Sequence, residues 1–267
     1  MKTSKLKVHF TDNELLQPTN PLTVNLIGGG GTGSKVLTCL VEMNHSLIML
    51  GHPGLDVRLW DDDIVTNANL GRQRFAESET GMNKAVALIN RANRWAGTNW
   101  KAETRKFGIA TLKQSGENVA ANIYITCVDN VATRFEMAEF LKIPRPRYSY
   151  DQPLYWMDYG NSRYTGQVIL STVGKIQQPK SRKYEPVANL PFITDEYPDL
   201  LKQSETKDDT PSCSLAQALE QQDLYINGAL AQLGSSLLWG MFRNGLTEHR
   251  GFFLNLKEFR SKAIPIG

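Results

Sequence analysis

The sequence predicts an α/β fold with a Rossmann-like, doubly wound mixed sheet, and three observations support this. An apolar run, LTVNLI, leads through a glycine-rich turn into a helical pattern. Short apolar runs then alternate with amphipathic helices as far as about residue 144, and after that β-rich runs follow one another without a helix between them. Strands that alternate with helices form parallel sheets, whereas consecutive strands form antiparallel hairpins. We therefore expect a parallel N-terminal half and an antiparallel C-terminal half.

Hydrophobic periodicity predicts the elements of the parallel half. Residues 22–27 predict a buried strand, and the helix that begins near Ser34 places its apolar side chains on one face. The elements expected after this helix are a strand at 56–60, a helix at 82–95, an edge-like strand at 101–107, a core strand at 122–128 and a helix at 130–141.

The second half carries a different pattern within what we expect to be one domain, residues 1–267. The runs PLYWMDYGN and RYTGQVILST predict an antiparallel pair of strands. A polar segment with several prolines, at about 174–212, predicts a long crossover loop. Helical periodicity resumes over 214–242 with a break near Gly228, and 251–256 predicts a last strand.

The composition excludes several classes of protein. A net charge of +3 from 30 basic and 27 acidic residues, spread along the chain, gives no support for DNA binding. No apolar run approaches the length of a membrane span and the first ten residues lack the apolar core of a signal peptide, so we expect a cytoplasmic protein. Three widely spaced cysteines and no Cys-x-x-Cys pair predict neither a disulfide framework nor zinc.

The glycine turn after the first buried strand predicts a nucleotide-binding loop. Gly28, Gly30 and Gly33 satisfy the Gly-x-Gly-x-x-Gly pattern between a strand and a helix, where backbone N–H groups accept phosphate charge. Asp61 ends the second strand, where a carboxylate can accept hydrogen bonds from ribose hydroxyl groups. These residues suit NAD and ATP equally well.

Basic and amide side chains beyond Asp61 favour a nucleoside triphosphate. Arg72 and Lys84 supply positive charge within reach of the glycine turn, and Asn69 and Gln73 accompany them. Asp129 follows a core strand at the sheet edge where open α/β folds bind ligands. One carboxylate beside phosphates suits Mg2+, which takes one or two carboxylates together with phosphate oxygens.

A plainer interpretation of the same residues remains open at this point. Asp61 can be a turn residue, Arg72 and Lys84 can lie on solvated surfaces, and Asp129 can cap the helix that begins near Asn130.

Several motifs in order resemble the ThiF/MoeB superfamily, the adenylating domain of ubiquitin-activating-type enzymes. They are the glycine loop with Gly31, the pair Asp61 and Asp63, NLGRQ, the GMNK tetrapeptide and CVDN followed by Arg134. The chain as a whole is similar to the ThiF-related proteins of PRTRC gene cassettes. The resemblance implies ATP as the nucleotide, with Asp61 on the ribose, Asn69, Arg72 and Lys84 near the phosphates, and Asp129 at the metal; Asp63 and Gln73 belong to the same matched set.

The resemblance also implies a reaction and partners. An adenylyltransferase of this type activates the C-terminal carboxylate of a small ubiquitin-like or sulfur-carrier protein, and homodimers are usual. Many relatives take a phosphate-binding arginine from the partner subunit's N-terminal region, whereas residues 1–57 of this chain contain none. The alternatives are an NAD(P)-dependent oxidoreductase with the same loop and a nucleotide-binding module without turnover.

Cys213 is the candidate for a thioester intermediate. It lies at the expected first turn of a helix, where the helix dipole lowers the pKa of a thiol. The alternative is a small packing residue at a helix start. Cys39 and Cys127 fall on an apolar helix face and in an apolar strand, so we expect both to be buried.

Overall fold

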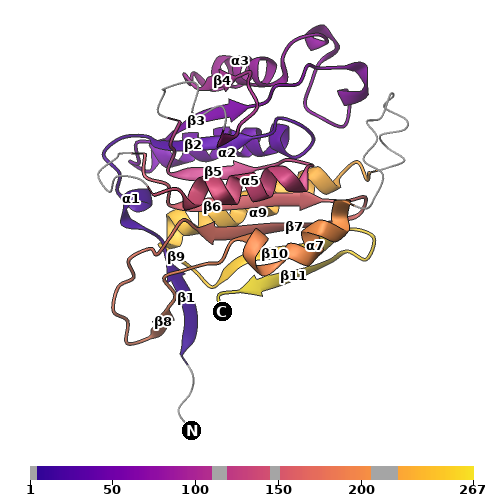
Figure 1. Cartoon of the computed structure of the whole chain (residues 1–267). Coiled ribbons are helices and arrows are strands. Elements are labelled where there is room, and N and C mark those ends of the chain that lie inside the picture. Colours follow the sequence, from indigo (N-terminus) through magenta and orange to yellow (C-terminus); the bar gives the residue numbers. More distant parts are fainter. Residues whose placement is uncertain (1–4, 110–118, 145–150, 206–221) are drawn as a thin grey trace.

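The fold is built on an eight-stranded mixed sheet (Figure 1). The computed structural model describes residues 5–109, 119–144, 151–205 and 222–267. The strand order is β11-β10-β7-β6-β5-β2-β3-β4, parallel from β6 to β4 and antiparallel from β6 to β11. The expected division into a parallel and an antiparallel half is confirmed. Its strands are β2 (Leu22–Ile27), β3 (Leu55–Trp60), β4 (Lys101–Glu103), β5 (Ile123–Thr126), β6 (Tyr155–Asn161), β7 (Thr165–Thr172), β10 (His249–Asn255) and β11 (Arg260–Pro265).

Helices cover both faces of the sheet, with α5 in front of it and α9 behind it in Figure 1. The helix α2 packs against α3 and α9, and α5 packs against α6 and α7. Neighbouring side chains of β2 point to opposite faces, so Leu26 belongs to one buried cluster and Ile27 to the other. The helices are α2 (Gly33–Met49), α3 (Lys84–Ala96), α5 (Val131–Lys142), α6 (Ile193–Glu196), α7 (Pro198–Glu205) and α9 (Ile226–Asn244), with two 3-10 turns, η1 (Asn67–Asn69) and η2 (Glu77–Glu79).

The fourth strand is shorter than the sequence predicts. We expected a strand over 101–107, but β4 ends at Glu103, which pairs with the last residue of β3, Trp60. Among the residues that the structure describes, no partner strand continues beyond this point. Phe107 instead turns into the core and packs edge-on against Trp60 and Phe140, with ring centroids 5.1 and 5.3 Å apart.

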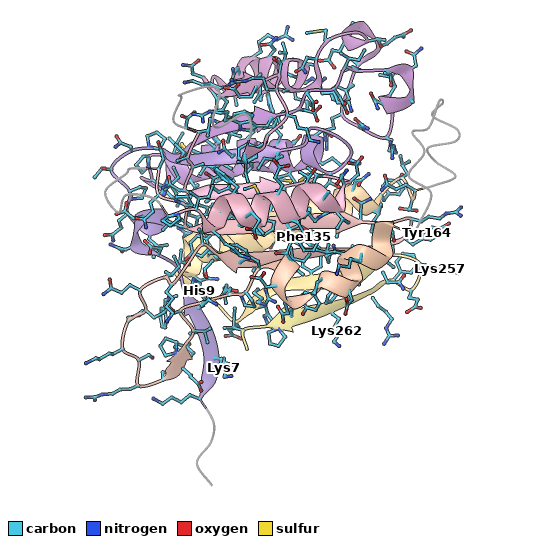
Figure 2. The ribbon with its side chains drawn as sticks, in the orientation of Figure 1. Lys7, His9, Phe135, Tyr164, Lys257 and Lys262 are labelled. Atoms are coloured by element: carbon cyan, nitrogen blue, oxygen red, sulfur yellow. The ribbon has the colours of Figure 1, made fainter. Side chains whose placement is uncertain are left out.

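A small second sheet, β8-β1-β9, was not predicted from the sequence. It joins β1 (Leu6–Phe10), which precedes the short helix α1 (Asn13–Leu16), to β8 (Tyr184–Pro186) and β9 (Leu246–Thr247). His9 on β1, labelled in Figure 2, is fully buried and lies 2.7 Å from the carbonyl oxygen of Val187 and 2.9 Å from the hydroxyl of Tyr155. The segment that we expected to be a plain crossover loop therefore contains β8, α6 and α7.

The last helix differs from the prediction at its start. Helix α9 runs through Gly228 without a break. Its N-cap is Tyr225, and Asp223, two residues earlier, accepts the N–H groups of Tyr225 and Ile226 at 2.8 and 3.1 Å. Residues 214–221 of the predicted helix lie outside the described residues. The strand expected at 251–256 is β10, and it forms a hairpin with β11 that we did not predict. Within the described ranges, no helix has the length and apolar character of a membrane span.

Candidate functional site

The glycine turn joins β2 to α2 by close backbone contact. Gly28 has a φ of +93° and donates its N–H to the carbonyl oxygen of Trp60 at 2.9 Å. A Cβ on Gly28 would lie 2.7 Å from the carbonyl oxygen of Cys127, and a Cβ on Gly33 would overlap the carbonyl oxygen of Gly28. A Cβ on Gly30, in contrast, would meet no atom within 4 Å. The loop is therefore packed against the protein at both ends and open at Gly30.

This difference predicts that two similar substitutions differ in their effect on stability. Gly33→Ala should lower the free energy of unfolding by about 1–3 kcal/mol, because the new Cβ must push two backbone segments apart. Gly30→Ala should leave stability within about 0.5 kcal/mol of the parent. Urea unfolding monitored by circular dichroism measures both changes, and equal losses in the two variants would contradict the loop geometry.

Asp61 is bonded directly to the glycine turn. Its Oδ2 accepts the N–H of Gly29 at 2.6 Å, and its Oδ1 accepts the N–H of Asp63 at 3.0 Å. Burial raises the pKa of the Asp61 carboxyl, while the Gly29 hydrogen bond and the charge of Lys84 act in the opposite direction. Asp61 therefore fixes the conformation of the turn. Its own carboxylate, which still has free lone pairs, lies beside the turn.

Lys84 lies beside this carboxylate rather than on a solvated helix face. It begins α3, is 7% exposed, and its Nζ lies 2.7 Å from Oδ2 of Asp63. Asn83 caps the same helix and donates its side-chain N–H to the carbonyl oxygens of Asp61 and Asp63. The two acids, Asn83 and Lys84 therefore form one polar unit next to Gly29.

Arg72 is connected to the glycine loop by a chain of side-chain hydrogen bonds. Its Nη1 donates to Oε1 of Gln222 at 2.9 Å, and Nδ2 of Asn227 donates to the same oxygen at 3.0 Å. Thr32, at the end of the glycine loop, donates its hydroxyl to Oδ1 of Asn227 at 2.8 Å. Burial lowers the pKa of Arg72, and attraction to Asp129 raises it. The sequence alone does not single out Gln222 or Asn227, because amides near a helix start carry no distinctive pattern.

Two buried polar atoms close to these hydrogen bonds have no hydrogen-bond partner in the described structure. They are Nε of Arg72 and Oε1 of Gln73. Buried polar groups are almost always paired, so unpaired ones beside an open loop fit a polar ligand. Asn69, in contrast, has a hydrogen-bond partner within the protein. Its Oδ1 accepts the N–H of Thr66 at 2.8 Å and thereby caps η1.

Asp129 is exposed and lies three residues beyond the end of β5. The helix cap that the plainer interpretation gave to Asp129 belongs to Asn130, whose Oδ1 accepts the N–H of Thr133 at 3.2 Å. Asp129 and Arg72 attract each other. Within the described residues no group of three His, Cys, Asp or Glu side chains forms a metal cluster.

Arg134 has a structural position in the core. Its Nε lies 3.0 Å from both carboxylate oxygens of Asp158, and its Nη2 donates to the carbonyl oxygens of Val128 and Tyr159 at 2.6 and 3.0 Å. Both partners are buried, at 4% and 1% exposure. Arg134 therefore holds the turn before Asp129 in place from beneath.

The cysteines of the described residues are poor nucleophiles. Cys39 and Cys127 are free thiols, and burial raises the pKa of both. Cys213 lies outside the described residues.

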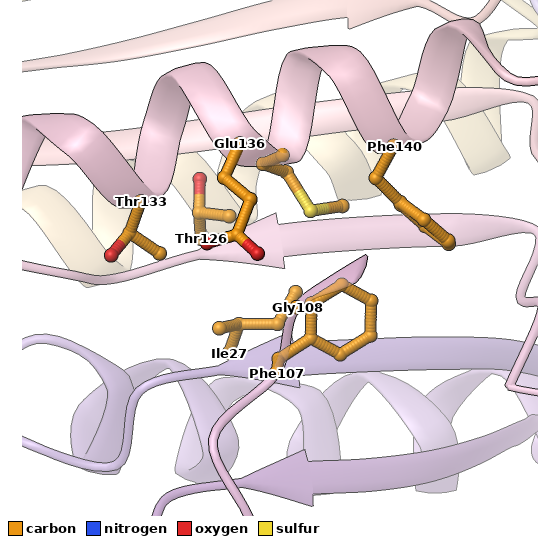
Figure 3. Close-up of a pocket in the computed structure, with 8 residues that line it drawn as sticks. Ile27, Phe107, Gly108, Thr126, Thr133, Glu136 and Phe140 are labelled. Carbon is orange, nitrogen blue, oxygen red and sulfur yellow. The ribbon is translucent and has the colours of Figure 1, made fainter. Parts of the chain in front are cut away.

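A small cavity lies near the carboxyl ends of β2 and β5 (Figure 3). Thr126, Thr133 and Glu136 face it on one side, and Phe107 closes the other side. Its volume is about 10 Å³, enough for roughly one water molecule. It is a gap in the core next to the glycine turn rather than a ligand site.

The fold and this site define a class of protein. A strand, a glycine turn and a helix, with a carboxylate on the turn, the buried Lys84 and the partly buried Arg72 beside it, are typical of the phosphate-binding edge of nucleotide-binding α/β proteins. The ThiF family profile matches residues 3–264, and the chain belongs to the ThiF family. Family membership supports a nucleotide-dependent adenylating enzyme.

Solved structures with the same fold share little sequence with this chain. PaaA is 15% identical, with a TM-score of 0.60 over 95% of this chain and 75% of its own. E. coli MccB with selenomethionine MccA is 14% identical, with a TM-score of 0.57 over 95% of this chain and 65% of its own. MccB with AMPCPP and MccA is 15% identical, with a TM-score of 0.58 over the same shares. No curated protein matches.

Proposed function

We propose that this protein uses ATP and Mg2+ to adenylate the C-terminal carboxylate of a small ubiquitin-like or sulfur-carrier protein, or of a peptide. The observation that carries this proposal is the pair of unpartnered polar atoms on Arg72 and Gln73 beside a loop that is open at Gly30. The MccB structures support it, because MccB was solved with the nucleotide AMPCPP and with MccA. NAD(P) gains no comparable support, since a hydride-transfer site does not need the two cations, the buried Lys84 and the partly buried Arg72.

The chemistry assigns a role to each residue. A substrate carboxylate oxygen attacks the α-phosphorus of ATP, the bond to the β-phosphate oxygen breaks, and pyrophosphate leaves. Charge repulsion opposes this attack, so cations and a fixed approach are the main contributions of the protein. In our proposal Asp61 binds the ribose, Arg72 and Lys84 neutralise the phosphates, and Asp129 holds Mg2+ with phosphate oxygens. Lys84 contacts Asp63, so its ammonium group is held beside the glycine turn, where we propose that the phosphates bind.

Two further parts of the proposal concern a cysteine outside this site and the oligomeric state of the protein. We propose Cys213 as the acceptor of the acyl group, giving a thioester after AMP departs. We also propose a homodimer as the working form. Intact mass spectrometry of Cys213→Ala tests the thioester, which should disappear while adenylation continues.

Exchange of radiolabelled pyrophosphate into ATP tests the proposed reaction. The protein, MgATP and a candidate small ubiquitin-like protein or peptide should give exchange, and Asp129→Asn should reduce it by roughly a hundredfold because the cation loses its protein ligand. Asp199→Asn, an exposed acid on α7, is the matched control and should exchange normally.

The other outcomes have definite meanings. Full exchange by Asp129→Asn would reject the metal assignment. ATP binding without exchange would favour a nucleotide-binding module, and NAD(P) binding without ATP binding would favour an oxidoreductase.

A further inference from the structure

A second pocket lies beside the glycine loop, between the first turn of α2, the segment 71–74 and the start of α9. It is open to solvent and has a volume of about 380 Å³. Lys35 and Arg74 supply its charged lining, and Leu224 and Tyr225 supply apolar surface, with Tyr225 72% exposed. None of these four residues belongs to the nucleotide-binding set described above.

The positive charge in this pocket is not neutralised within the described structure. Neither Lys35 nor Arg74 has a carboxylate oxygen within 4.0 Å among the described residues. Lys35 donates its Nζ to the carbonyl oxygen of Arg72 at 3.1 Å, so its head group is held in position. Burial lowers the pKa of Lys35, and the charges of Arg74 and Arg72 lower it further. The nearby acid Asp223 is occupied by the backbone N–H groups of α9. An incoming anion would relieve this repulsion.

The residues that line this pocket are not those of the proposed phosphate site, and Arg72, whose charge acts on Lys35, adjoins both. The guanidinium of Arg72 bonds Gln222 and is attracted to Asp129, whereas its carbonyl oxygen meets Lys35. Asn227 closes the loop at Gly31, where a Cβ would lie 2.5 Å from its Nδ2. A nucleotide seated at the open side, Gly30, would therefore leave this pocket for a group on another molecule.

We propose that this pocket binds an acidic segment of the protein or peptide substrate, in which a carboxylate side chain stands next to an apolar one. Lys35 and Arg74 bind the carboxylate, and the apolar neighbour packs on Tyr225 and Leu224. Charge complementarity carries this proposal, since two cations that have no carboxylate partner among the described residues line the pocket next to exposed apolar surface. That this acidic segment belongs to the substrate rests on the proposed function, whereas its binding to the pocket does not.

Fluorescence anisotropy tests the proposal with short fluorescein-labelled peptides. One peptide alternates glutamate with leucine, and its control carries glutamine in place of glutamate. The glutamate peptide should bind more tightly, and Lys35→Gln and Arg74→Gln should each weaken it by roughly tenfold, because each removes a charge-assisted hydrogen bond. Tyr225→Ala, at an exposed position that folding does not need, should weaken both peptides.

Lys262→Gln is the matched control for net charge. Lys262 lies on the edge strand β11, separated from β2 by four strands of the sheet, and is labelled in Figure 2. Its variant should bind like the parent protein, and saturating MgATP should not displace the peptide.

Several results would overturn the proposal. Equal affinity for the two peptides, equal losses in Lys262→Gln and Arg74→Gln, or displacement of the peptide by ATP would each do so. A change of oligomeric state in Tyr225→Ala without a change in peptide binding would assign the face to self-association. Failure of pyrophosphate exchange would leave the peptide result standing, so the two proposals fail separately.

Discussion

Replacing Arg134 with methionine is expected to lower the free energy of unfolding by about 3–5 kcal/mol. The substitution leaves the carboxylate of Asp158 charged and buried, with Thr126 still donating its hydroxyl at 2.6 Å but without its cation. Two carbonyl oxygens, those of Val128 and Tyr159, lose their donor as well. Removing one partner of a buried ion pair lowers the free energy of unfolding far more than replacing both partners with apolar side chains does, because the remaining charge stays buried without a counter-ion.

Chemical unfolding monitored by tryptophan fluorescence measures this loss. Trp156 reports on the same network, since its Nε1 donates to the hydroxyl of Thr126 at 2.9 Å. The double variant Arg134→Met with Asp158→Leu should recover much of the stability, because it removes the orphaned charge together with its partner.

Lys142→Met is the matched control for a basic-to-methionine change on the same helix. Lys142 is about half exposed and lies 3.5 Å from Glu139 and 3.3 Å from Asp195. Surface pairs of this kind contribute about 0–1 kcal/mol, so the control should change little. A loss as small in Arg134→Met as in Lys142→Met would contradict the buried-pair interpretation.

The parallel half of the fold could be predicted because its signals are local. The apolar run at 22–27 and the glycines after it lie next to each other in the chain, and β2 and α2 follow them closely. The same holds for Asp61, which comes directly after the last residue of β3, and for Asn130, whose type suits a helix cap. Local propensity and tertiary structure agree at these positions.

The parts that were missed depend on contacts between distant segments. The end of β4 is set by the end of β3, and β1 is a strand because β8 and β9 pair with it. Gln222 lies 150 positions from the arginine that it holds. Gly228 breaks no helix because the packing of α9 on α2 outweighs its weak helix propensity. No periodicity within a short window carries this information.

Arg72→Lys is expected to reduce pyrophosphate exchange by about two orders of magnitude while leaving the protein folded. Lysine keeps the positive charge but loses the planar fork, so it cannot hold Gln222 and a phosphate oxygen at the same time. The unpaired Nε of Arg72 is the donor that we propose for the phosphate, and lysine has no equivalent of it. The fold should tolerate the replacement, because Oε1 of Gln222 keeps its second donor, Nδ2 of Asn227, when Arg72 is changed.

Two companion variants separate the contact from its positioning. Gln222→Ala should reduce exchange by about tenfold, since Arg72 keeps its donors but loses the bond that orients it. Arg94→Lys changes an exposed arginine in the last turn of α3 and should exchange normally. If Arg72→Lys exchanged as fast as Arg94→Lys, positive charge alone would suffice at this position. The hydrogen-bond chain from Thr32 to Arg72 would then serve only to close the loop, and the phosphate contact would have to come from Lys84.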